Sequence, residues 1–161
     1  MNTIISRQGI SKTNYAPDKA DIFTLKACFE LEYLLLGELR ELLDEPETRY
    51  TRPAILLILD RLLANLPRQL KLKSKGGYLS GVLGVFPNWQ EQVESLRCED
   101  LARISTLEEL RSLVAAGSSF SHIVHETHHQ LQLWMQLLAA HRKEERRLIQ
   151  KATNLDLGGE S

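Results

Sequence analysis

The sequence predicts an all-α protein, folded as an antiparallel, up-and-down four-helix bundle. Three observations support this prediction. Apolar residues recur at alternating steps of three and four along four long segments, which is the spacing of one helix face. Alternating apolar and polar runs and Asn-Gly or Asp-Gly turns, which would indicate strands and hairpins, do not occur. Modest loops join the four segments, as they do in bundles whose neighbouring helices run antiparallel.

Length and charge limit the classes of function. The 161 residues make one ordinary domain, and 20 basic against 21 acidic side chains leave a formal net charge of -1. This balance favours neither nucleic acid nor an anionic membrane as a partner. No signal peptide is visible, and no apolar run approaches the ~20 residues of a membrane span. We therefore expect a cytoplasmic protein without nucleic-acid or membrane partners, with Cys28 and Cys98 as reduced, buried thiols. A protein partner is compatible with this composition, but the sequence does not identify one.

The N-terminal part predicts an arm followed by the first helix. Residues 1–20 mix Ser, Asn, Gly, Pro and Lys with little periodicity, so we expect an irregular arm. The first helix should begin at Asp18 or Asp21, either of which would cap it, and end at Leu43. Glu32 interrupts its otherwise apolar face. That face consists of Ile22, Leu25, Phe29, Glu32, Leu36, Leu39 and Leu43.

The second helix should begin near Pro53, with Thr51 as its cap, and should continue through Pro67. Gly76 and Gly77 end it, and residues 78–84 could add a short helical turn. The last two members of its buried face are polar and lie four residues apart. The face consists of Ile55, Leu59, Leu62, Leu66, Gln69 and Lys73.

The third helix should follow Pro87, with Asn88 as cap and Glu91 three residues on. A second capping box, Thr106 with Glu109, suggests a break within this helix. Its predicted face consists of Trp89, Val93, Leu96, Asp100, Arg103 and Leu107.

The fourth helix should run from Ser118 to about Leu155, which places the bundle at residues 21–157 and a flexible tail at 158–161. Two polar residues, His141 and Glu145, lie on its apolar face between Leu138 and Leu148. The full face consists of Phe120, Val124, Thr127, Leu131, Trp134, Leu138, His141, Glu145, Leu148 and Ala152.

Polar residues therefore interrupt the buried face of every helix. Because these faces meet in a bundle, the polar side chains are expected to converge at one level of the core. Metal-binding four-helix bundles place inward-facing His and carboxylate side chains in this way. The six converging residues are Glu32, Gln69, Lys73, Asp100, His141 and Glu145.

Together with this spacing, the segments GGYLSGVL, PNWQEQVESLR and HRKEERRLIQKATNLDLGG resemble hemerythrin-like (HHE cation-binding) domains, especially divergent bacterial members. The resemblance spans the chain from about residue 22. It implies a four-helix bundle with a non-haem di-iron centre that serves oxygen binding, iron sensing or related redox roles. Typical members place a His and a Glu four apart in the second helix, where this chain has Gln69 and Lys73. All five histidines lie between His122 and His141, so a standard di-iron centre cannot be assembled within this chain.

Three interpretations of the converging residues follow. In the first, Lys73 replaces the metal and pairs with carboxylates, while Gln69 and His141 complete the hydrogen bonds. In the second, a single iron or other divalent ion binds to four of the residues and Lys73 turns outward. In the third, the assignment of the helix faces is off by one residue and several of these groups reach solvent. The four candidate ligands are Glu32, Asp100, His141 and Glu145.

Outside this cluster, His125 and His129 lie four residues apart, a spacing that can chelate a metal on a helix surface. The alternative is an ordinary solvated face. The charged run HRKEERR, including Arg142, is also assigned to solvent, apart from His141 and Glu145. We expect a non-enzymatic regulatory or interaction protein with a degenerate di-iron site. The alternative is a metal-binding protein of unusual coordination that senses or stores iron, oxygen or redox equivalents.

Overall fold

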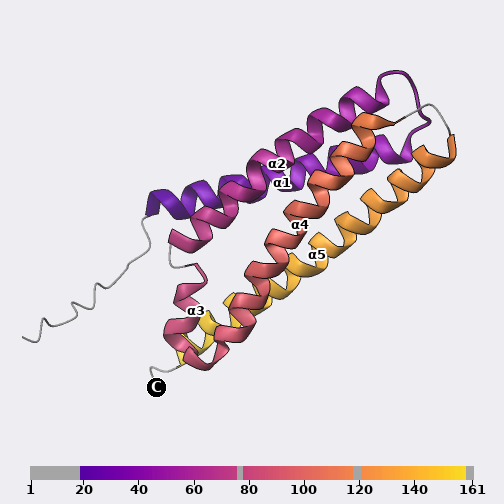
Figure 1. Ribbon diagram of the computed structural model, residues 1–161. Helices are drawn as coiled ribbons and strands as arrows, with labels where there is room; N and C mark the ends of the chain where they lie inside the picture. Colours follow the sequence, from indigo (N-terminus) through magenta and orange to yellow (C-terminus); the bar gives the residue numbers. More distant parts are fainter. Residues whose placement is uncertain (1–18, 76–77, 118–120, 159–161) are drawn as a thin grey trace, which may run out of the picture.

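The computed structural model describes residues 19–75, 78–117 and 121–158, and within these ranges the chain is all-helical, as predicted (Figure 1). A short helix α3 and a 3-10 turn at Pro87–Trp89 separate two pairs of long helices. The predicted N-terminal arm, apart from its last two residues, and residues 159–161 of the predicted tail lie outside the described ranges. The helices are α1 (Lys19–Asp44), α2 (Thr51–Lys75), α3 (Ser80–Val85), α4 (Gln90–Ala116) and α5 (Ser121–Gly158).

The long helices lie alongside one another (Figure 1). α1 packs on α2, α2 on α4 and α4 on α5, while α3 lies against α5. Helices α1 and α5 approach each other closely at only a few places. None of the described helices is long and apolar enough to cross a membrane.

The start of α1 excludes one of its two predicted caps, and the cap of α2 differs from the prediction. Helix α1 begins at Lys19, so Asp21 lies in its first turn and does not cap it, while the other predicted cap, Asp18, lies outside the described residues. Before α2, the backbone N–H of Thr48 donates to Thr51 Oγ1 at 2.9 Å, and the Tyr50 N–H donates to Thr48 Oγ1 at 3.3 Å. Thr48 therefore has the capping role that was predicted for Thr51, and Thr51 completes the capping box. Helix α2 continues through Pro67, as predicted.

Helix α4 is continuous, so the predicted break at Thr106 is wrong. Leu107 and Leu110 are buried in the core immediately after that point, and this packing outweighs a local capping signal. The predicted Asn88 cap is also wrong: α4 begins at Gln90 without a side-chain cap. The preceding turn is held by the rings of Phe86 and Trp89, which stack with centroids 3.8 Å apart.

The core consists of two apolar clusters. The larger one joins α1, α2, α4 and α5 and includes Leu39, Leu59, Leu107 and Leu138, all fully buried. The smaller one joins α3, α4 and α5, and its buried members are Val82, Leu96, Leu148 and Ala152. Along α4 and α5 a layer of polar side chains lies between the two clusters, so the candidate site sits inside the protein.

Two apolar positions are more exposed than predicted. Ile22 is 49% exposed, so the buried face of α1 does not extend to its first turn. Cys28 is buried as expected, but Cys98 is exposed on α4. Both cysteines are free thiols.

Candidate functional site

Seven polar side chains meet in the interior and form what we call the ion network. Each residue is at most 9% exposed. One comes from α1, two from α2, one from α4 and three from α5. Six of them lie three or four residues from a buried apolar residue of the same helix, and Lys73 lies four residues after the buried Gln69, so the periodicity that builds the core also turns these side chains inward. The members are Glu32, Gln69, Lys73, Asp100, His141, Arg142 and Glu145.

Lys73 joins the carboxylates of α4 and α5. Its Nζ donates to Asp100 Oδ2 at 3.1 Å and to Glu145 Oε2 at 2.9 Å. The same nitrogen lies 5.5 Å from the centroid of the Phe29 ring, within the range of a cation–π interaction. An ammonium group has three donors. Two carboxylates and one aromatic ring therefore satisfy it.

Arg142 connects all four long helices. Its Nε and Nη2 donate to Glu32 Oε2 and Oε1 at 3.1 and 2.9 Å, a bidentate pair. Its Nη2 also donates to Gln69 Oε1 at 2.9 Å. Its Nη1 donates to Asp100 Oδ1 at 3.1 Å and, more weakly, to Glu145 Oε2 at 3.5 Å. These contacts engage all five N–H groups of the guanidinium.

Gln69 extends the network to the backbone of α1. Its Nε2 donates to Glu32 Oε1 at 3.2 Å and, at 3.4 Å, to the carbonyl oxygen of Cys28. Asn65, one turn earlier on α2, donates to the same carbonyl at 2.9 Å. The buried amides of α2 thus anchor α1 at the level where Glu32 enters the network.

His141 is the imidazole of the network. Its Nδ1 lies 2.8 Å from Oε2 of Glu99, a carboxylate at the protein surface. Its Nε2 lies 3.1 Å from Asp100 Oδ1 and 3.5 Å from Glu145 Oε2, but neither contact has the alignment of a hydrogen bond. Burial lowers the pKa of His141, but the neighbouring carboxylates outweigh burial and raise this pKa to about 9. The ring is therefore protonated at neutral pH.

The formal charges of the network balance. Burial raises the pKa of Asp100, but contacts with His141 and Lys73 outweigh it and hold this pKa well below its usual range. The pKa of Glu145 is lowered against burial by the same two side chains. Asp100 and Glu145 are therefore ionised, and together with the Glu32–Arg142 ion pair this gives three formal negative charges that face three positive ones. These are Glu32, Asp100 and Glu145 against Lys73, His141 and Arg142.

The six residues predicted to converge all lie in this layer, whereas Arg142 was assigned to a solvated face and that assignment is wrong. Its position does carry a signal: Leu138, Arg142 and Glu145 follow one another at steps of four and three. Helical spacing alone admits both His141 and Arg142 as inward residues. The prediction placed three carboxylates in the interior but only one lysine to balance them. This imbalance of charge could have indicated that Arg142 also points inward.

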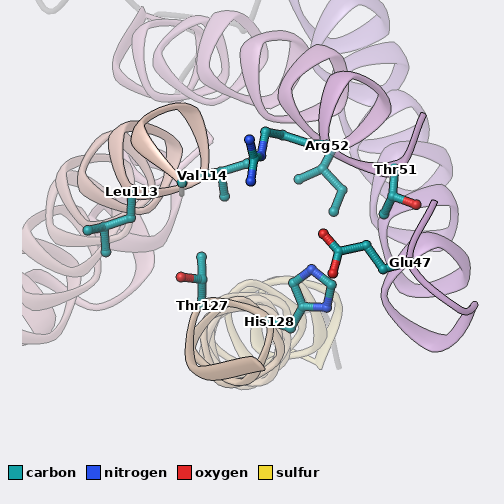
Figure 2. Close-up of a pocket in the computed structure, with 9 residues that line it drawn as sticks. Glu47, Thr51, Arg52, Leu113, Val114, Thr127 and His128 are labelled. Carbon is teal, nitrogen blue, oxygen red and sulfur yellow. The ribbon is translucent and has the colours of Figure 1, made fainter. Parts of the chain in front are cut away.

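The other predicted metal position, His125 with His129, lies at the surface, where both residues are exposed. The neighbouring His128 is half-buried and lines a small cavity of ≈ 30 Å³ together with Glu47, Arg52 and Val114. In Figure 2 its ring and the Glu47 carboxylate lie side by side, and burial lowers the pKa of His128. A cavity of this size holds about one water molecule, so it is too small for an organic ligand.

Three residues of the ion network could hold a single metal ion only after a rearrangement. Ligand atoms of Asp100, His141 and Glu145 lie within 4.8 Å of one another, and these residue types suit a divalent ion. Such an ion would have to displace Lys73, whose Nζ already contacts both carboxylates, and to deprotonate His141. A di-iron centre does not fit. The described helices other than α5 contain no imidazole, and the α2 position at which the family resemblance implies a ligand holds the ammonium of Lys73.

Comparisons with known protein families, curated proteins and solved structures found no match to this chain.

Proposed function

We propose that this chain is a hemerythrin-like, up-and-down four-helix bundle in which the ion network replaces the metal centre. We further propose that it acts as a regulatory or interaction protein and catalyses no reaction. The observation that carries the proposal is the position of Lys73, whose ammonium bridges Asp100 and Glu145. A lysine is a poor metal ligand but an effective counter-charge. The resemblance suggests the bundle, and Lys73 together with the lack of histidines outside the fourth predicted helix supports a role without the metal.

The balance of charges supports an ion network that has replaced a metal centre, and not a metal site that lacks its ion. A metal centre normally supplies the positive charge that compensates buried carboxylates. Here Lys73, Arg142 and protonated His141 supply it, and all five N–H groups of Arg142 are engaged. A buried cluster of this kind is stable only when its members are paired and hydrogen-bonded. An additional divalent ion would leave the layer with excess positive charge.

Metal analysis of the purified protein tests the proposal. Protein prepared without a His tag and without chelators is expected to contain far less than one metal atom per chain. Dialysis against a chelator should leave its urea unfolding midpoint unchanged. One iron atom per chain, or a chelator-induced loss of stability, would rule out the replacement of the metal by the ion network.

A second candidate function is the binding of one divalent ion at Asp100, His141 and Glu145. The observation that favours it is the buried Nε2 of His141, which faces two carboxylates without an aligned hydrogen bond. In that case Glu145→Gln abolishes metal uptake, while His129→Gln, which changes an exposed imidazole, preserves it. Loss of uptake in His129→Gln alone would move the metal to the protein surface.

A further inference from the structure

A pocket of ≈ 640 Å³ lies between α1 and α5, where these two helices approach each other at few places. Its volume falls within the range of about 300–1,000 Å³ that is typical of small-molecule sites. Helix α1 contributes Phe29, Tyr33 and Leu36, and α5 contributes Ala139. Tyr78, which precedes α3, also lines it. The pocket adjoins the ion network, because three network residues, Glu32, Arg142 and Glu145, form part of its wall.

Small residues keep this pocket open. Gly37 lies in the interior of the 26-residue helix α1, two turns before its end, and lines the pocket. A Cβ added there would meet no atom within 4 Å. Glycine weakens a helix interior, and no close approach of another chain segment requires glycine at this position. Ala139 lines the same space from α5. The combination leaves room for a ligand where two larger side chains would close the gap between the helices.

The chemistry of the lining indicates an uncharged ligand. The guanidinium of Arg142 has no free donor, and both carboxylate oxygens of Glu32 accept hydrogen bonds from it. The exposed charges at the pocket comprise two acidic and two basic side chains, namely Glu38, Glu41, Arg40 and Arg146. These four charges cancel, so the rim has no net charge that would favour an anion or a cation, and an ionic ligand would lose hydration on entering the pocket.

Aromatic rings and one hydroxyl group specify the ligand further. The ring centroids of Phe29 and Tyr78 lie 6.1 Å apart, and Tyr33 adds a third ring to the lining. Such walls favour planar aromatic compounds. The Tyr78 hydroxyl lies next to the buried carboxylate of Glu145, to which it can donate its proton. Its oxygen can then accept a hydrogen bond from an N–H or O–H group of the ligand.

We propose that the pocket between α1 and α5 binds an uncharged aromatic compound that carries one N–H or O–H group. This inference goes beyond the proposed function and uses the ion network only as one wall of the pocket. Metal analysis and ligand binding therefore test separate claims, and either can fail without the other.

Two dyes with the same ring system provide the test. N-phenyl-1-naphthylamine is uncharged and has one N–H, and 8-anilino-1-naphthalenesulfonate adds a sulfonate to the same skeleton. The uncharged dye should bind with saturable fluorescence at one dye per chain. The sulfonate should bind at least about tenfold more weakly, because it would lose hydration at a rim without net charge and beside the buried carboxylate of Glu145. Absence of saturable binding by the uncharged dye, or equal affinity for both dyes, would overturn the proposal.

Neighbouring variants locate the bound dye. Ala139 and Ala140 are both exposed on α5, but only Ala139 lines the pocket. Ala139→Leu should lower the affinity for the uncharged dye at least about tenfold, whereas Ala140→Leu should leave it unchanged. Gly37→Leu should act like Ala139→Leu, with Gly37→Ala as its control. Far-UV circular dichroism checks that each variant is folded. Equal affinities of folded Ala139→Leu and Ala140→Leu would place the dye elsewhere.

Discussion

Each cation of the ion network has a different structural role. Arg142 contacts carboxylates on α1, α4 and α5 and the side-chain amide of Gln69 on α2. Lys73 donates hydrogen bonds to carboxylates of α4 and α5, and His141 links the network to Glu99 at the surface. Removing one partner from a buried pair leaves the remaining charges uncompensated, which costs more than the pair contributes. Single substitutions in this layer are therefore informative.

Lys73→Met should destabilise the protein by about 3–5 kcal/mol, because Asp100 and Glu145 would remain buried without their counter-charge. Lys71 is exposed on the same helix, so Lys71→Met is the matched control and should change stability by less than about 0.5 kcal/mol. Urea unfolding followed by circular dichroism measures both. Similar effects of the two variants would show that the Lys73 ammonium does not stabilise the interior.

Stability should also depend on the protonation of His141. The network raises the pKa of His141 to about 9, above the value of about 6.5 in an unfolded chain. The stabilising contribution of the charged ring is thus complete below pH 6.5 and is lost as the pH rises through 9. At about 1.4 kcal/mol per pKa unit, the loss amounts to roughly 3 kcal/mol. Urea titrations between pH 6 and 10 measure it.

His141→Gln should remove most of this pH dependence, whereas His129→Gln, at an exposed position, should keep it. A flat profile for the unchanged protein would contradict a protonated ring at neutral pH.

At the scale of elements, helical periodicity predicted most of the inward positions. On α2 every member of the predicted face, from Ile55 to Lys73, is buried. Ends and caps were harder to predict, because local capping patterns at Asn88 and Thr106 compete with packing that the sequence does not display. Arg142 was missed for a related reason. It lies at the edge of the buried face of α5, and whether a residue at such an edge is buried depends on which side chains of the neighbouring helices lie opposite it.

Helix α1 should become more stable when Gly37 is replaced by alanine. The added Cβ meets no atom within 4 Å, and alanine in a helix interior is more favourable than glycine by about 0.5–1 kcal/mol. Gly117→Ala is the contrasting variant, because its Cβ would lie 3.2 Å from the backbone oxygen of Val114, a tight contact with an atom that cannot rotate away as the nearby Arg52 guanidinium can. Thermal unfolding should therefore show a higher midpoint for Gly37→Ala than for Gly117→Ala. The reverse order would contradict the open space described at Gly37.

At the scale of the whole molecule, a charged layer separates two apolar clusters. Leu138 belongs to the larger cluster and Leu148 to the smaller, with His141 and Glu145 between them on α5. The sequence predicted the level of this layer, because interruptions in four helix faces can be aligned. It could not predict the pairing within the layer, because pairing depends on the rotation of each helix. For this reason the sequence left Glu32, Asp100 and Glu145 as alternative partners of Lys73.

If a cation is required in this layer, exchanging Lys73 for a carboxylate should make folding depend on a metal ion. Lys73→Glu removes one positive charge and adds a negative one, and the new carboxylate would lie beside Asp100, His141 and Glu145, whose ligand atoms are within 4.8 Å of one another. Four such ligands suit Mn²⁺ or Zn²⁺. The apo variant should be destabilised or unfolded, and an ion present at 100 times its Kd should restore about 2.7 kcal/mol. Lys71→Glu, at an exposed position, should show no such response. Thermal unfolding across a metal titration measures the effect. A Lys73→Glu variant that no ion stabilises would contradict the inference that the lysine occupies a cation position.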